Sequence, residues 1–111
     1  MTDVRLLGLR HTRLTKSAPA KDTTLAASPS TVTLWFSKPV QARLTRIQLV
    51  DAKGTVVATD APAFLGESET VVVAHLRGAA APGAYTVTWA TTSKDSHVVK
   101  GSYTFRVNGA R

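Results

Sequence analysis

Two side chains near the C-terminus have the types and the spacing to bind a metal ion. Asp95 and His97 lie two positions apart in the stretch SKDSHVVKGSYTF, residues 93–105. Because side chains alternate between the two faces of an extended chain, positions i and i+2 point the same way, so this carboxylate and imidazole can converge. The pattern is compatible with a pair of metal ligands or with a polar strand end that binds nothing, and taken alone the second is the commoner.

The other reactive residue types form no recognisable catalytic pattern. The absence of cysteine excludes disulfides, thiolate metal sites and cysteine nucleophiles. The serines lack a nucleophile turn, and no two carboxylates are placed for acid and base roles. His75 ends the run TVVVAH without an acidic neighbour, which favours a strand-edge or partly buried neutral histidine over a ligand. We therefore expect no enzymatic activity.

The chain is basic, which raises the question of nucleic-acid binding. Its 14 Lys and Arg against 7 Asp and Glu give a net charge of +7. Basic residues crowd the stretch from Arg5 to Lys21 and are then scattered singly, without a recognition helix or a continuous basic face that carries aromatic stacking groups. This distribution is typical of a solubilising surface, and we expect no nucleic-acid partner.

Length and hydropathy indicate one domain that does not span a membrane. A chain of 111 residues can bury one core but not two, and no apolar stretch reaches the roughly 20 residues of a membrane-spanning helix. The start MTDVRLLGLR lacks the apolar core of a secretory signal. We expect residues 1–10 to be an extension, disordered or added by cloning, and residues 11–108 to form the domain.

Alternation of apolar and polar residues predicts an all-β fold. Residues 31–37, TVTLWFS, place apolar side chains on one face and are followed by a proline. Similar segments span 46–50, 55–59, 70–76, 84–91 and 101–107, and the first two of these are expected to pair as a hairpin. We predict an immunoglobulin-like Greek-key β-sandwich, with residues 17–30 extended over it. Its expected core includes Leu34, Phe36, Leu49, Val87, Trp89 and Phe105.

An ordered set of short motifs resembles the CopC family of copper-resistance proteins. The motifs begin with His11, followed by Ser17-x-Pro19 and by the strand end Phe36-Ser37. They continue with PGAYTVTW at 82–89 and with SKDSH at 93–97, which precedes a glycine and an aromatic strand. Each motif is weak alone, but their order is specific and covers most of the chain from His11 onward.

The resemblance implies a secreted or periplasmic Cu(II) protein that acts as a carrier or store. In such proteins the first histidine of the mature chain binds through its amine and its ring, and the Asp-x-His element completes a roughly square site. The matching positions here are His11, Asp95 and His97. Nitrogen and oxygen donors of this kind suit Cu(II). A histidine and amine site also serves oxidative copper enzymes, so the ligands alone do not exclude redox activity, but the small domain offers no visible substrate groove.

Three features depart from the family pattern. Lys38 stands where some relatives have an acidic residue after Phe-Ser, so we expect one ligand fewer and a cation near the site. Met1 is the only methionine, which argues against the Cu(I) loop of some relatives. His11 follows ten residues and has no free α-amine in this chain, so we expect weak Cu(II) binding here and tighter binding when His11 is the first residue.

The expected partners follow from the same resemblance. They are the copper ion and, as a family implication, a membrane copper-transport protein; we expect the chain itself to be a monomer. The alternative is an immunoglobulin-like interaction module that binds no metal in this form.

Overall fold

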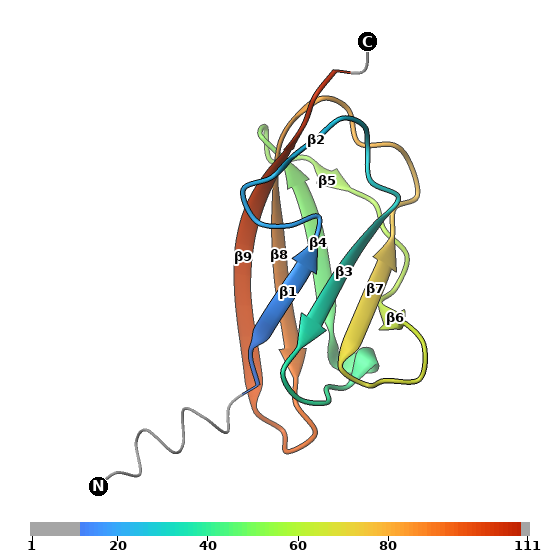
Figure 1. Ribbon diagram of the computed structural model, residues 1–111, viewed down its shortest axis with the longest axis vertical. Helices are drawn as coiled ribbons and strands as arrows, with labels where there is room; N and C mark the ends of the chain where they lie inside the picture. Colours follow the sequence, from blue (N-terminus) through green and yellow to red (C-terminus); the bar gives the residue numbers. More distant parts are fainter. Residues whose placement is uncertain (1–11, 110–111) are drawn as a thin grey trace, which may run out of the picture.

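The computed structural model describes residues 12–109, which form two β-sheets packed face to face (Figure 1). In hydrogen-bonded order, the first sheet contains β1 (Leu14–Ala18), β3 (Thr31–Phe36), β7 (Val71–His75) and β6 (Ala63–Phe64). The second contains β2 (Thr24–Leu25), β9 (Val98–Val107), β8 (Gly83–Thr92), β4 (Arg46–Asp51) and β5 (Val56–Val57). A 3-10 helix, η1 (Ala42–Leu44), lies between β3 and β4. No helix in the described range is long and apolar enough to cross a membrane.

The chain changes sheets repeatedly, as in a Greek key. It passes from β3 to β4, forms the β4–β5 hairpin, returns to β6 and β7, and then crosses again to β8 beside β4. All strand pairs are antiparallel except β2 with β9. The predicted all-β, immunoglobulin-like Greek-key sandwich is therefore confirmed, and so is the predicted hairpin.

Alternating strand positions build the core between the sheets. The predicted core residues are all buried. They are joined there by Val32, Ile47, Val72, Tyr85, Tyr103 and Val107, among others. Full burial of an apolar side chain of this size contributes roughly 1.5–3 kcal/mol. A slip of one residue would turn these side chains to solvent, so the core also sets the strand register.

Trp89 packs in this core near the end of β8. Its ring meets that of Phe36 edge to face, with centroids 5.4 Å apart and an interplanar angle of 65°. On the neighbouring strand its backbone partner is Gly101, and a Cβ atom built there would lie 2.9 Å from Cζ2 of the indole. The absence of a side chain at Gly101 thus makes room for the tryptophan.

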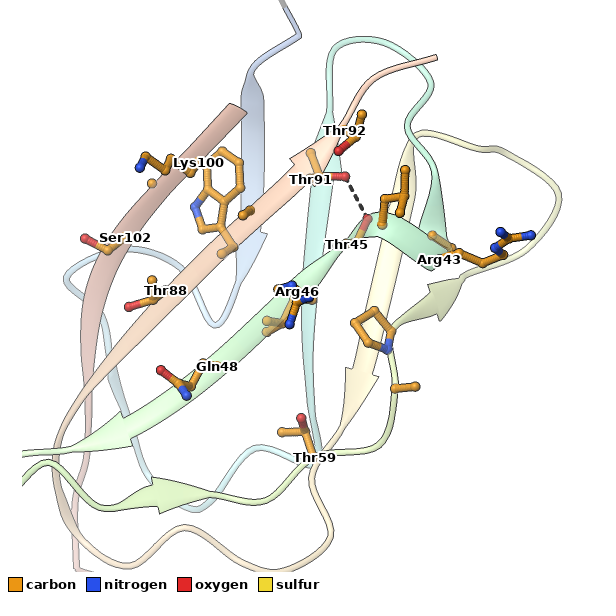
Figure 2. Close-up of a pocket in the computed structure, with 18 of the residues that line it drawn as sticks. Arg43, Thr45, Arg46, Gln48, Thr59, Thr88, Thr91, Thr92, Lys100 and Ser102 are labelled. Atoms are coloured by element: carbon orange, nitrogen blue, oxygen red, sulfur yellow. Dashed lines mark hydrogen bonds between the residues drawn. The ribbon is translucent and has the colours of Figure 1, made fainter. Parts of the chain in front are cut away.

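A buried polar pair joins the residue before β4 to β8. The hydroxyls of Thr45 and Thr91 lie 2.7 Å apart (Figure 2). The Thr45 hydroxyl also donates to the carbonyl of Gln41 at 2.8 Å. These bonds tie the residues that follow η1 to β8.

Three distant segments meet at one end of the sandwich. The start of β1 joins the end of β3, since the amide of Ser37 donates to the carbonyl of Arg13 at 2.8 Å. The connection from β3 to η1 meets the end of β8 through a bridge between Val40 and Ser93. In Figure 1 the turn from β8 to β9 projects at this same end. The fold therefore places the Asp-x-His element beside residues far away in sequence.

The N-terminal segment differs in part from the prediction. Residues 14–18 form an edge strand that the alternation did not reveal. After Ala18 the chain leaves β1 and reaches the opposite sheet, where β2 pairs with the end of β9. The segment 17–30 therefore does extend over the sandwich.

Candidate metal centre

Asp95 and His97 lie in the turn between β8 and β9, residues 93–97, and not on a strand. The amide of Ser93 donates to the carbonyl of His97 at 2.9 Å, and that of Ser96 donates to the carbonyl of Ser93 at 3.0 Å. Ser96 has a left-handed φ of 73°, a conformation that reverses the chain. The prediction that these two side chains converge is correct, but the strand alternation offered as its reason is wrong, because β9 begins only at Val98.

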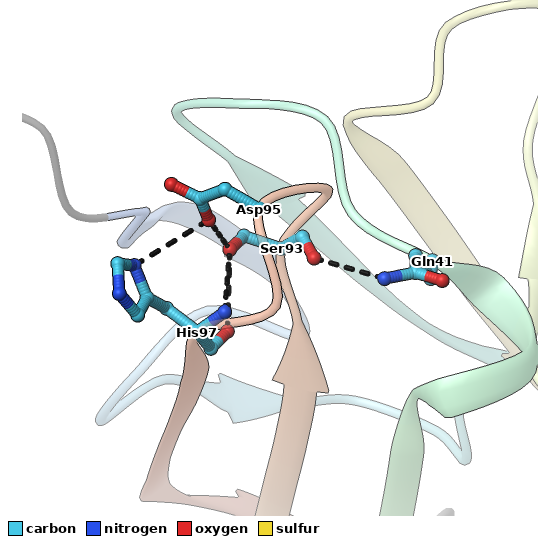
Figure 3. A network of polar contacts seen from close by, with 4 residues as sticks. All are labelled: Gln41, Ser93, Asp95 and His97. Carbon is cyan, nitrogen blue, oxygen red and sulfur yellow. Dashed lines mark hydrogen bonds and ion pairs between the residues drawn. The ribbon is translucent and has the colours of Figure 1, made fainter.

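Ser93 is the hub of this turn (Figure 3). Its side chain is buried, and its hydroxyl donates to Oδ1 of Asp95. The hydroxyl oxygen of Ser93 also accepts from the amide of His97 at 3.2 Å. From the connection between β3 and β4, Nε2 of Gln41 donates to the carbonyl of Ser93 at 2.9 Å. A buried residue thus fixes the backbone of a turn whose two candidate ligands stay outside.

The two candidate ligands face each other at the surface. Nδ1 of His97 lies 3.4 Å from Oδ1 of Asp95, and each side chain is 66% exposed. The hydrogen bond from the Ser93 hydroxyl, followed by the nearby His97 and by backbone amides, lowers the pKa of Asp95. The carboxylate is therefore held in its anionic form, which is the form that binds a cation. Carboxylate oxygen and imidazole nitrogen suit divalent metals such as Cu(II).

A small hollow of about 210 Å³ lies beside Asp95. Its walls include Thr12, which is buried, together with Pro39 and Ser93. Lys38 and Lys94 also line it, which confirms that a cation lies near the site. Nζ of Lys94 is 3.2 Å from Oε1 of Glu69, so part of its charge is offset. The start of the described chain, at Thr12, therefore lies beside the carboxylate of Asp95.

Between Thr12 and Gly109, no three His, Asp or Glu side chains form a group able to hold a metal. Of the predicted ligands, Asp95 and His97 are brought together, whereas His11 lies outside the described residues. His75 ends β7 beside the start of β3, at the opposite end of the sandwich. Its side chain is exposed, not partly buried. His75 is thus remote from the pair.

Sequence reasoning missed the residues that support the pair. Ser93 could have been recognised from the sequence, because it is the first residue of the Ser-x-Asp-x-His motif. Gln41 could not, because it lies 52 positions from Ser93 and belongs to no motif near it.

Comparison with known proteins covers nearly all of this domain. Residues 14–108 match the CopC domain family. The chain is 31% identical over 97 residues to Protein YobA of Escherichia coli strain K12, an alignment that covers 87% of this chain and 78% of YobA.

Solved structures with the same fold include two copper-resistance relatives. The crystal structure of CopC from Methylosinus trichosporium OB3b matches with a TM-score of 0.85 and 27% identity, covering 91% of this chain and 97% of that one. The structure of PcoC, a methionine-rich copper-resistance protein from Escherichia coli, matches with a TM-score of 0.79 and 29% identity, covering 88% and 99%. In contrast to PcoC, this chain has a single methionine.

Proposed function

The chain belongs to the CopC family, and from this premise we propose that it is a copper-resistance protein that carries or stores Cu(II) outside the cytoplasm. The observation that carries the proposal is the pair of Asp95 and His97, whose facing atoms are 3.4 Å apart. A carboxylate with a lowered pKa and an adjacent imidazole are a donor pair for a divalent cation. The proposed role is binding and delivery, not catalysis.

The pair needs little movement to take an ion. Imidazole nitrogen and carboxylate oxygen bind divalent zinc at about 2.0–2.2 Å, and with similar bonds two adjacent donors of a square site lie about 3 Å apart. The observed 3.4 Å between Nδ1 and Oδ1 is a few tenths of an ångström longer. Because both side chains are largely exposed, small rotations that leave the core in place can close this difference.

We propose His11 as the third ligand. His11 directly precedes Thr12 in the sequence, and Thr12 lines the hollow beside Asp95. When His11 is the first residue, its α-amine can add a second nitrogen. An α-amine has a pKa of about 7.7–8.0, so copper can displace its proton near neutral pH, and the amine and ring of one residue form a chelate. In the chain of 111 residues, His11 has only its ring to offer.

Titration with Cu(II), followed by electron paramagnetic resonance, tests the ligand pair. In the form that begins at His11, His97→Ala should abolish tight binding and leave the circular dichroism spectrum unchanged, because the side chain is exposed and outside the core. The matched control is His75→Ala, which removes an exposed histidine at the opposite end of the sandwich and should leave binding intact. Equal weakening by the two substitutions would show that the ligands are assigned wrongly.

Two forms of the chain test the role of the amine. Residues 1–111 and residues 11–111 are compared by competition against a copper chelator at fixed pH. We expect much tighter binding for the shorter form, since only there does His11 carry a free amine. Equal affinities would mean that the amine is not a ligand.

The alternative function is an immunoglobulin-like interaction module that binds no metal in this form. It is favoured by the finding that, within residues 12–109, only two candidate ligands lie together, whereas a tight site needs more. The copper titration separates the two proposals, because the module would leave the spectrum of free Cu(II) unchanged. Delivery to a membrane copper-transport protein is proposed from family membership alone, and a monomeric state remains our expectation.

A further inference from the structure

The outer face of the second sheet carries a large groove, which we call the sheet groove (Figure 2). The sequence-based expectation that the domain offers no groove is therefore wrong. The floor of the sheet groove is the solvent side of β4, β8 and β9, where Gln48, Thr88 and Ser102 alternate with buried neighbours. Its walls are η1 and residues 56–62. The hollow measures about 1490 Å³, which exceeds the roughly 300–1,000 Å³ typical of small-molecule pockets. It is therefore of a size for a segment of polypeptide.

Strand register places two cations on either side of this floor. Ala90 is the backbone partner of both Arg46 on β4 and Lys100 on β9. Since neighbouring strands are about 4.8 Å apart, the backbones of the two basic residues are separated by about 10 Å, and the side chain between them is the methyl group of Ala90. Arg43 on η1 adds a further positive charge to the wall. The groove thus has basic side chains on two strands of its floor and on one wall.

The positive charge of the groove is not offset from within. Asp60 is the only acidic residue among those that line it. Its Oδ1 is already bound to Nε of Arg77, which lies outside the lining, at 2.9 Å. Arg43, Arg46 and Lys100 are therefore available to an anionic ligand, and none of the three forms a salt bridge within the described part of the chain.

Exposed apolar side chains gather along the same groove. Four large hydrophobic residues in the described range are at least half exposed, and three of them, Leu44, Val56 and Val98, line the groove. Val98 is 68% exposed. Apolar contacts within a charged rim are the usual composition of a protein-binding surface.

We propose that the sheet groove binds an acidic, extended segment of a partner protein that carries apolar side chains among its carboxylates. The carboxylates would meet Arg46 and Lys100, and the apolar side chains would meet the exposed valines. Bases of a nucleic acid would need exposed aromatic rings, yet the one aromatic residue in the lining, Trp89, is buried. A second copy of this chain is disfavoured because each carries a net charge of +7.

The groove also reaches the candidate metal centre. Thr92 and Val98 line it and flank the turn 93–97. A segment bound along the sheet would end close to Asp95 and His97. Binding of such a segment does not require copper, because neither Asp95 nor His97 lines the groove.

Fluorescence anisotropy with the full chain tests the proposal. The probe is a short fluorescein-labelled peptide of glutamates with two leucines. Arg46→Glu combined with Lys100→Glu should weaken its binding at least about tenfold, which corresponds to about 1.4 kcal/mol. The matched control is Lys21→Glu combined with Lys53→Glu, which makes the same change of charge at exposed positions outside the groove and should weaken binding far less. Val98→Ser should weaken binding without a change of charge.

Specificity and location provide independent readouts. In nuclear magnetic resonance spectra of the unmodified chain, the peptide should shift amide signals of β4, β8 and β9 around Ala90. A peptide with lysine in place of glutamate should not bind, and His97→Ala should bind the acidic peptide normally, so this test stands apart from the copper titration. Equal losses in the two charge-reversed variants, shifts confined to another surface, or tighter binding of a single-stranded oligonucleotide or of phosphatidylglycerol vesicles would each overturn the proposal.

Discussion

Replacing Gly101 by alanine should destabilise the domain through a single added methyl group. The new Cβ would lie 2.9 Å from Cζ2, 3.1 Å from Cε2 and 3.3 Å from Nε1 of Trp89. Optimal contacts between carbon atoms are about 3.5–4.0 Å, so the indole would have to retreat by about 0.6 Å or more. Its path is obstructed, because Trp89 is buried and packs against Phe36.

The expected cost follows from this lack of space. Overpacking of a filled core costs typically about 1–3 kcal/mol. For a domain of this size each kcal/mol lowers the melting temperature by about 4–8 °C, so Gly101→Ala should melt roughly 5–20 °C below the unmodified chain. Urea unfolding followed by tryptophan fluorescence gives the free energy, and near-ultraviolet circular dichroism reports the indole environment.

Gly78→Ala is the matched control. A Cβ there meets nothing within 4 Å, and the glycine does not adopt a positive φ. That substitution should be neutral, or stabilising by about 0.4–1 kcal/mol through the unfolded state. In a chain that carries Trp89→Phe, which has a smaller ring, Gly101→Ala should cost less than it does alone. The steric explanation is wrong if the two alanine variants are equally stable, or if the cost is unchanged beside the smaller ring.

Three further predictions concern buried and exposed hydroxyl and carboxyl groups. Thr45→Val and Thr91→Val should each cost about 1–3 kcal/mol in urea unfolding, because each leaves a buried polar partner, and the double variant should cost less than the sum. Ser93→Ala should raise the pKa of Asp95, as measured by a carboxyl titration in nuclear magnetic resonance; an unchanged pKa would remove the hydroxyl as its cause. Since that pKa is lowered in the folded state, the contribution of Asp95 to stability is present above its unfolded pKa of about 3.9 and is lost as pH falls through the folded value. The difference in stability between Asp95→Asn and the unmodified chain should therefore be present at neutral pH and vanish in strong acid, and a constant difference across this range would contradict the assignment.

The long strands were predictable because each buries one face. In β4, β8 and β9 this burial imposes a period of two on the residue types, which can be recognised without knowledge of the partner strands. In β3 the residue types alternate in the same way, although Thr33 on its other face is buried too. The residue types of the short strands β1, β2 and β6 show no such period. They lie at sheet edges, and their conformation is set by the backbone of the neighbour with which they pair.

The candidate site was predictable in composition but not in geometry. The types and spacing of Asp95 and His97 predicted that they converge, whereas the turn that achieves it depends on a left-handed Ser96 and on the buried Ser93. The sheet groove could not be predicted from the sequence, because Arg46 and Lys100 become neighbours of Ala90 only through the register of three strands. Local patterns report which face a residue occupies, and they do not report what lies across from it.

The short edge strands have a consequence for behaviour at high protein concentration. Three of the four sheet edges, β2, β5 and β6, are only two residues long. The fourth edge, β1, is interrupted by a register shift between Leu14 and Lys16, and the ammonium group of Lys16 lies 4.7 Å from the ring centroid of Trp35 on the adjacent strand. Fibril growth by strand addition needs an open, regular edge, typically about six or seven residues long. None of these four edge strands provides this template by itself. However, β2 covers β9 only at Arg106 and Val107, so the preceding part of β9 keeps an open outer edge, and strand addition in the native state would begin there.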